Sequence, residues 1–154
     1  MIRSILALAI STIVVAGCAT TGPLGNEVLN ASMNPKIARV VIYRKSMIGL
    51  AVQPDYVVDG KPVAASQPGG FVSCDLQPGR HIIAVSNPAI SNSLTGVGSE
   101  NFSLDLRAGT VTYFNAAVQP GLVLGQLTLT NVTDIQGQAD VGDLHQISAG
   151  CTTS

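Results

Sequence analysis

The chain has 154 residues, of which 11% are charged, and its formal net charge at pH 7 is −1. This balance lacks the basic surface on which nucleic-acid binding depends, so we expect no nucleic-acid partner. Apolar residues make up 46% of the chain and aromatic residues only 4%. That length and composition favour one small-residue β domain with a core of its own.

Residues 1–17 have the three parts of a secretory signal peptide. Arg3 supplies the charge, an apolar run covers residues 5–15, and Ala16 and Gly17 precede Cys18. The run is shorter than the roughly 20 apolar residues that a membrane span needs. The sequence Val-Ala-Gly-Cys at 15–18 resembles the lipobox of bacterial lipoproteins, which implies cleavage before Cys18 and acylation of its sulfur. The alternative is an ordinary signal peptide followed by a coincidental cysteine.

The lipobox resemblance implies a place in the cell. Ala19, rather than Asp, follows the cysteine, which implies the outer membrane, with the protein facing the periplasm. Membrane lipid is then a partner through acylated Cys18, and two or more acyl chains anchor a protein lastingly. Residues 18–36 have no sustained period and contain several breakers, so we expect a flexible tether there.

From residue 37 the pattern changes to short alternating runs bounded by Gly and Pro, which is typical of a sandwich or barrel. Within 37–44, Ala38, Val40 and Ile42 share one face. Strands on either side of Asp59-Gly60 predict a tight hairpin, because this pair accepts positive φ angles. Pro62 confines the returning strand to a sheet edge.

The β pattern continues from residue 71 to residue 132, with one long loop. Residues 71–76 and 81–85 flank a Pro-Gly turn and predict a second hairpin, with Cys74 facing the core. Residues 87–99 read as the longest loop, and 102–132 predicts a meander of three strands. The fold class is therefore all-β, an antiparallel β-sandwich of about seven to eight short strands over 37–133. In the polar tail, 134–154, the spacing of Leu144 and Ile147 favours one short helix.

The cysteines fall into two groups. With Cys18 acylated, Cys74 and Cys151 remain as an even pair in an oxidising compartment, where disulfides persist. We therefore expect them to be bonded. The alternative is a buried free Cys74 with Cys151 on a frayed tail.

Several segments together carry a family resemblance. They are Arg39 to Arg44, Tyr-Val-Val-Asp-Gly-Lys-Pro-Val at 56–63, Leu-Gln-Pro-Gly-Arg-His-Ile at 76–82, and Leu-Asp-Leu-Arg-Ala-Gly at 104–109. The chain resembles an uncharacterised (DUF) β-sandwich domain family of small bacterial lipoproteins. Parts of these segments are also similar to surface-layer type carbohydrate-associated β modules. The resemblance implies a fold and an envelope location but no catalytic residue.

No group of residues forms a recognisable active site. Cys74, Asp75 and the two histidines, His81 and His145, lack the close spacing that pre-organises a metal site. The serines nearest to an acid or a histidine are not in a nucleophile elbow, and no glycine run opens a helix to hold a phosphate. We expect no catalytic residue, metal or cofactor, and hence no enzyme.

Two segments are the best binding candidates. Met47, Ile48 and Leu50 form an apolar stretch after the first strand, and exposed apolar patches mark partner sites; burial under the sheet edge is the alternative. The second segment is the 87–99 loop. A basic group, Lys36, Arg39, Arg44 and Lys45, either contacts anionic lipid or pairs with acids such as Asp134, Asp140 or Asp143. We therefore expect a non-enzymatic envelope module that binds a protein or glycan; the alternative is a periplasmic carrier with a small apolar ligand between its sheets.

Overall fold

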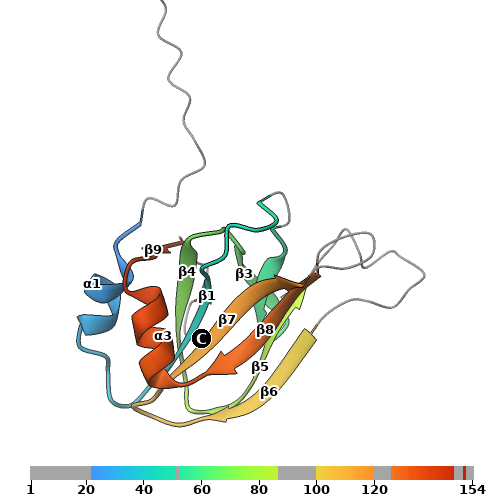
Figure 1. Ribbon diagram of the computed structural model, residues 1–154. Helices are drawn as coiled ribbons and strands as arrows, with labels where there is room; N and C mark the ends of the chain where they lie inside the picture. Colours follow the sequence, from blue (N-terminus) through green and yellow to red (C-terminus); the bar gives the residue numbers. More distant parts are fainter. Residues whose placement is uncertain (1–21, 51–52, 87–99, 120–125, 148–150, 152–154) are drawn as a thin grey trace, which may run out of the picture.

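The computed structural model describes residues 22–50, 53–86, 100–119, 126–147 and 151. Within them the chain forms two β-sheets that pack face to face as a sandwich (Figure 1). The all-β fold class predicted from the sequence is confirmed. The predicted signal peptide and Cys18 lie outside the described residues, as does the 87–99 loop.

Among the described residues, one sheet has five strands in the order β8-β7-β1-β4-β9, and the other has four in the order β3-β2-β5-β6. The five are β1 (Ala38–Arg44), β4 (Gly70–Leu76), β7 (Val111–Gln119), β8 (Gln126–Val132) and β9 (His145–Gln146). The four are β2 (Asp55–Val58), β3 (Lys61–Ala65), β5 (Gly79–Ser86) and β6 (Glu100–Leu106). Most neighbours pair antiparallel, as predicted, but β1 pairs with β7 and β4 with β9 in parallel.

The core lies between the two sheets, because alternate residues of each strand point inward. Val40 and Ile42 of β1 are fully buried, and so is Cys74 of β4, as the alternation predicted. They form one contiguous cluster with inward residues of the second sheet, among them Tyr56 and Ile83. Burial of this apolar surface is the main force that holds the sheets together.

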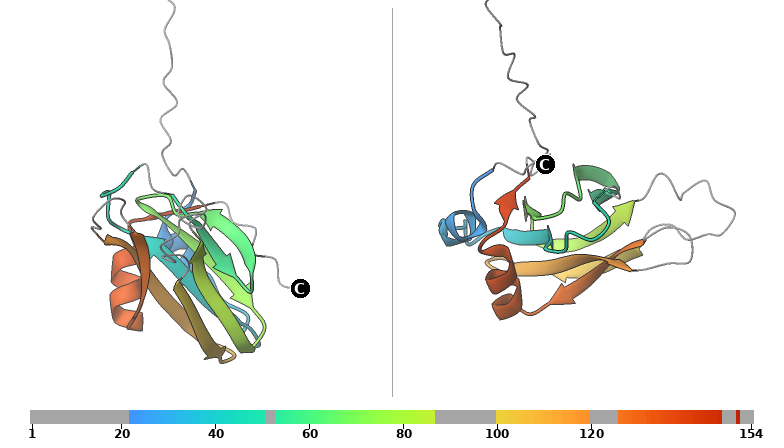
Figure 2. Two further views of the ribbon diagram at one scale, coloured as in Figure 1. Left: turned by 90° about the vertical axis from the view of Figure 1, so that its right-hand side faces the viewer. Right: turned by 45° about the horizontal axis from the view of Figure 1, so that its top comes forward.

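The outer face of the five-stranded sheet is also apolar and is covered by two helices (Figure 2). These are α1 (Gly25–Asn30) and α3 (Asp134–Val141). They bury Val41 and Tyr43, the residues of β1 that point away from the sandwich interior. β1 is therefore buried on both faces, which explains its almost unbroken apolar sequence.

Two residues determine where α3 begins and how closely it packs on the sheet. Thr133 is its N-cap, and the Thr133 hydroxyl accepts a hydrogen bond from the backbone N–H of Gln136 (3.3 Å). Gly137 faces β7, and a Cβ at this position would overlap the ring of Tyr113. Only glycine therefore allows the helix to lie this close to the strand.

The expectation of a flexible tether over 18–36 is wrong for residues 22–36. Pro23 lies beside β9, where its carbonyl accepts a hydrogen bond from the Gln146 N–H (2.9 Å), and α1 then packs against α3. Val28 and Leu29 of α1 join the outer apolar cluster. A helix of six residues is too short to be stable alone, so tertiary packing rather than local propensity forms it.

Residues 134–147 of the C-terminal tail pack against the sandwich and contribute to its core. The expected short helix exists as α3, but Leu144 and Ile147 lie after it. Leu144 packs under the helices and Ile147 enters the core between the sheets. Their three-residue spacing therefore reflects opposite faces of an extended chain and not one face of a helix.

Some turns connect neighbouring strands of one sheet, and others connect strands of different sheets. The Asp59-Gly60 hairpin is confirmed, with φ angles of 51° and 78°, and Pro62 lies on β3 at a sheet edge. The second hairpin and the meander are wrong in part, because β4 and β5 belong to different sheets, and so do β6 and β7. Only β7 and β8 pair within the predicted meander.

Candidate functional site

The loop that follows β1 presents the predicted interaction residues on the surface. We call residues 45–50 the apical loop. The side chains of Met47, Ile48 and Leu50 are 60%, 71% and 57% exposed. They are three of the five large apolar side chains that are exposed in the described part of the chain. The alternative for these residues, burial under the sheet edge, is wrong.

Arg44, the last residue of β1, holds the apical loop from inside. The Arg44 side chain is fully buried. Its Nη2 donates hydrogen bonds to the carbonyl oxygens of Ile48 (2.6 Å) and Gly49 (2.8 Å), and its Nη1 donates to the carbonyl of Ser66 (3.0 Å). Burial lowers the pKa of Arg44, but a guanidinium remains charged in proteins. One charged donor therefore ties the loop to the connection between β3 and β4.

Further contacts fix the backbone of the apical loop. The Ser46 hydroxyl accepts a hydrogen bond from the Ile48 N–H (3.1 Å), and the Gln53 side chain donates one to the Leu50 carbonyl (3.0 Å). Gly49 has a φ of 72° and lies against Val118 of β7. The loop thus exposes apolar side chains, while three of its carbonyls and the Ile48 N–H are hydrogen-bonded.

The sequence predicts one exposed basic group that includes Arg44. In the structure its members are separate: Arg44 is buried, and Arg39 and Lys45 pair with different acids. Arg44 continues the inward series of Ala38, Val40 and Ile42, so the alternation alone already pointed to burial. Lys45, at 64% exposure, pairs with Asp140 (2.8 Å), as the alternative of acid pairing predicted. Tyr43 also donates to Asp140 (2.8 Å), and burial, with this hydrogen bond, raises the pKa of Tyr43.

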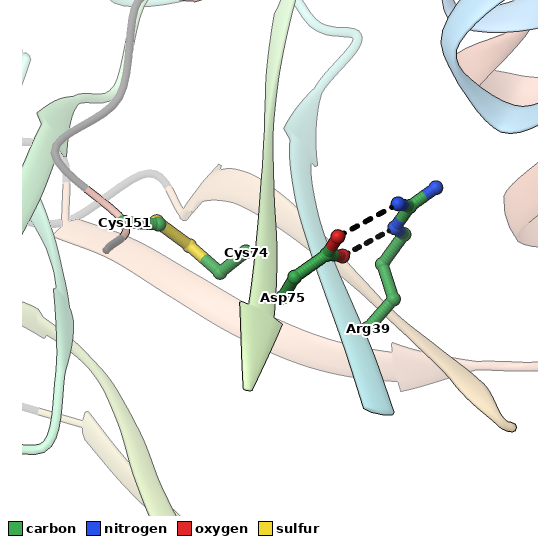
Figure 3. Close-up of a disulfide and its surroundings, with 4 residues drawn as sticks. All are labelled: Arg39, Cys74, Asp75 and Cys151. Carbon is green, nitrogen blue, oxygen red and sulfur yellow. Dashed lines mark hydrogen bonds and ion pairs between the residues drawn. A yellow bond between two sulfur atoms is a disulfide. The ribbon is translucent and has the colours of Figure 1, made fainter. Parts of the chain in front are cut away.

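Cys74 and Asp75 are neighbours on β4 but point to opposite faces of the sheet (Figure 3). Cys74 is bonded to Cys151 inside the sandwich, with their Cα atoms 5.1 Å apart, so the predicted disulfide is confirmed. On the outer face Asp75 accepts two hydrogen bonds from Arg39, from Nε at 2.6 Å and from Nη2 at 2.9 Å. Neither residue is left for catalysis.

His81 lies on the other sheet, between two acceptors. Its Nδ1 is 2.7 Å from the Asp59 carboxylate and its Nε2 is 2.8 Å from the Gln77 carbonyl. Burial lowers the pKa of His81, but these hydrogen bonds outweigh it and leave the pKa raised. The two acceptors suit the imidazolium form of His81, in which both ring nitrogens carry a hydrogen and donate it. No three His, Cys, Asp or Glu residues that could hold a metal lie together in the described part of the chain.

A hollow of about 220 Å³ opens on the outer face of the five-stranded sheet. Its lining includes Asn26, Leu29, Met33, Arg39, Tyr113 and Gln138. It therefore lies between the helices and the sheet. The carrier hypothesis placed its ligand between the sheets, where the described side chains instead form a contiguous apolar cluster.

No helix in the described ranges combines the length and apolarity that a membrane crossing requires. Residues 35–125 match the family model described as "Protein of unknown function (DUF2846)". The matched stretch covers β1 to β7 and more than half of the 154 residues. It leaves out α1, β8, α3 and β9. No curated protein matches the chain. With its uncharacterised-domain resemblance confirmed, the chain belongs to the DUF2846 family.

Proposed function

We propose that this protein is a lipid-anchored module of the bacterial envelope. Acylated Cys18 attaches it to the outer membrane on the periplasmic side. The domain is not an enzyme but a β-sandwich interaction or structural module, whose contact surface is the apical loop. Its partner is a component of the envelope: a protein, a glycan or the lipid itself.

The observation that carries the module assignment is the geometry of the apical loop. Exposed apolar side chains are common singly, but a cluster on an ordered loop is typical of a contact surface. Met47, Ile48 and Leu50 cluster in this way, and Arg44 fixes the backbone beneath them. A surface already ordered in the free protein loses little conformational entropy when it binds.

Two further features support the envelope location. The pattern of residues 1–18 is that of a lipoprotein signal. The bond between Cys74 and Cys151 suits an oxidising compartment such as the periplasm, where disulfides persist. The contiguous core between the sheets favours the module over the alternative, a carrier for a small apolar ligand.

The anchor is tested by metabolic labelling with a palmitate analogue. The wild-type protein should incorporate the label and remain with the membranes, whereas Cys18→Ser should do neither. A wild-type protein that is unlabelled and soluble would refute the proposal.

The contact surface is tested by a photoreactive amino acid at position 48, with position 82 as the matched control. Ile82 is a 47% exposed isoleucine on β5, away from the apical loop. In living cells position 48 should give adducts with an envelope component, identified by mass spectrometry, and position 82 should not. Equal yields at both positions would contradict the assignment of the loop.

A further inference from the structure

We infer that the partner of the apical loop is the lipid bilayer in which Cys18 is anchored. This inference rests on the proposed function, because it requires acylation of Cys18. It adds a second point of contact, through Met47, Ile48 and Leu50, and therefore a fixed orientation of the sandwich on the membrane.

First, one end of the sandwich lies beside Gly22, the first described residue after Cys18. His145 of β9 contacts the Gly22 carbonyl through Nδ1 at 2.8 Å. In the sheet His145 is opposite Gly70 of β4, and Gly70 is opposite Arg44 of β1. Gly22 and the start of the apical loop therefore lie in one row across the same end of the sheet. Figure 1 shows the segment that leads into α1 and the loop after β1 at the upper end of the molecule.

The second step is the length of chain between the anchor and the fold. Cys18 is four residues before Gly22, and a chain of that length spans roughly 14 Å at most. Adjacent strands lie about 4.8 Å apart, so the row from Gly22 across β9 and β4 to β1 is of similar width. The anchored cysteine thus keeps this whole end of the sandwich close to the lipid headgroups, and no long tether separates the two.

The third step is the chemical contrast between the two ends. In the apical loop the exposed side chains of Met47, Ile48 and Leu50 are apolar. Lys45, the first residue of the loop, is 64% exposed and pairs with Asp140. Long apolar side chains flanked by a lysine are suited to the boundary between headgroups and acyl chains. The apical-loop end also carries exposed Asp143, near Lys45. The opposite end carries more exposed charge, namely Lys36, Arg80, Asp105 and Arg107. The end that would meet lipid is the one with apolar side chains.

The fourth step is the backbone of the apical loop. Polar backbone groups that enter an apolar phase without hydrogen bonds carry a large cost. Here the carbonyls of Ile48, Gly49 and Leu50 accept hydrogen bonds from Arg44 and Gln53, and the Ile48 N–H is bonded to Ser46. The loop can enter the headgroup region without breaking these bonds.

The experiment uses tryptophan as a depth probe, since the chain contains none. Lipidated Ile48→Trp and Ile82→Trp proteins are purified from membranes and reconstituted into vesicles of phosphatidylethanolamine and phosphatidylglycerol. Part of the lipid is brominated high on the acyl chains, and bromine quenches nearby tryptophan. Ile48→Trp should lose a large part of its fluorescence, because an interfacial apolar face lies at the boundary between headgroups and acyl chains, and Ile82→Trp should lose little.

Flotation of the same vesicles separates the possible failures. A protein that floats with the vesicles but shows no quenching at position 48, or equal quenching at both positions, overturns this inference and leaves the anchor intact. A protein that does not float overturns the anchor and the inference together. A protein adduct at position 48 in cells, without lipid adducts, also overturns the inference.

One more variant excludes insertion driven by the probe itself. Adding Met47→Ser and Leu50→Ser to Ile48→Trp should markedly reduce the quenching, because the neighbouring apolar side chains then no longer favour the lipid. Unchanged quenching would mean that tryptophan alone enters the bilayer, and this would overturn the inference.

Discussion

Replacing Arg44 by methionine tests how the apical loop is held. Arg44→Met keeps a long apolar stem but removes the charged donor from three carbonyls, those of Ile48, Gly49 and Ser66. Hydrogen bonds to a charged group contribute about 1.5–3 kcal/mol each. Their simple sum overstates the loss, because the variant no longer buries a guanidinium and the loop carbonyls can turn toward water.

Ser66 is fully buried, so its carbonyl cannot turn toward water when the Arg44 donor is removed. We therefore expect Arg44→Met to lower the free energy of unfolding by about 2 kcal/mol, within the range for a buried carbonyl left without its donor. The matched control is Arg80→Met. Arg80 and Asp105 are 74% and 70% exposed, so this change should cost less than about 0.5 kcal/mol.

The assay is urea unfolding of the mature protein in mild detergent, with the disulfide intact, followed by circular dichroism. Trypsin cleavage after Lys45 reports on the loop and should become faster in Arg44→Met but not in Arg80→Met. If the two variants unfold at the same urea concentration and Lys45 is cut equally fast in both, then Arg44 does not hold the loop.

Three further predictions, the first with a control variant, concern the rest of the fold. Gly137→Ala should destabilise the domain by about 1–3 kcal/mol in urea unfolding because its Cβ overlaps an aromatic ring. Gly142→Ala, where a Cβ meets nothing closer than 3.6 Å, should be neutral or stabilising by up to about 1 kcal/mol; equal effects would contradict the packing of α3. Cys151→Ser should lower the free energy of unfolding by about 4 kcal/mol, the chain-entropy value for a loop of this length. A wild-type melting temperature that a reductant does not change would count against the disulfide. Asp59→Asn keeps a residue that tolerates positive φ but removes the carboxylate that pairs with His81. The pKa of His81 is raised in the folded state, so its ion pair stabilises the fold below about pH 6.5 and is lost as the pH rises through the folded-state pKa. The pKa of Asp59 is lowered, so its contribution is present above about pH 3.8 and is lost as the pH falls through the folded-state pKa. The stability deficit of Asp59→Asn should therefore be largest between those values; a deficit independent of pH would contradict the ion pair.

The alternation of apolar residues was enough to predict the sandwich and the inward side of its strands. It placed Cys74 in the core and, because the cysteines are few, named Cys151 as its partner. The Asp59-Gly60 turn was equally readable, since two consecutive positive φ angles leave few alternatives. These features depend on local chemistry, which a single sequence contains.

The sheet to which each strand belongs could not be read in the same way. A turn that contains glycine reverses the chain whether the next strand joins its own sheet or the other one. The Pro78-Gly79 turn after β4 and the Ala108-Gly109 turn after β6 therefore do not indicate the change of sheet. Likewise α1 and β9 are too short to have a period, and their positions are fixed by partners distant in sequence, such as Gly25 against Val141.

In the candidate site, the apolar residues of the apical loop could be predicted but their support could not. The burial of Arg44 follows from the alternation of β1, but its carbonyl partners lie in loops whose positions the sequence does not specify. The tether was misjudged for a related reason, since residues 22–36 become ordered only through contacts with the tail. If Cys18 is the proposed anchor, only residues 19–21 separate it from the described fold, which begins at Gly22.

The mass of the first tryptic peptide of the mature protein tests the central claim most directly. In protein purified from membranes this peptide should run from Cys18 to Lys36 and carry the added mass of a diacylglyceryl group and an amide-linked acyl chain. In Cys18→Ser no such peptide should be found. An unmodified wild-type peptide that begins at Cys18, or one that begins elsewhere, would contradict the lipid anchor.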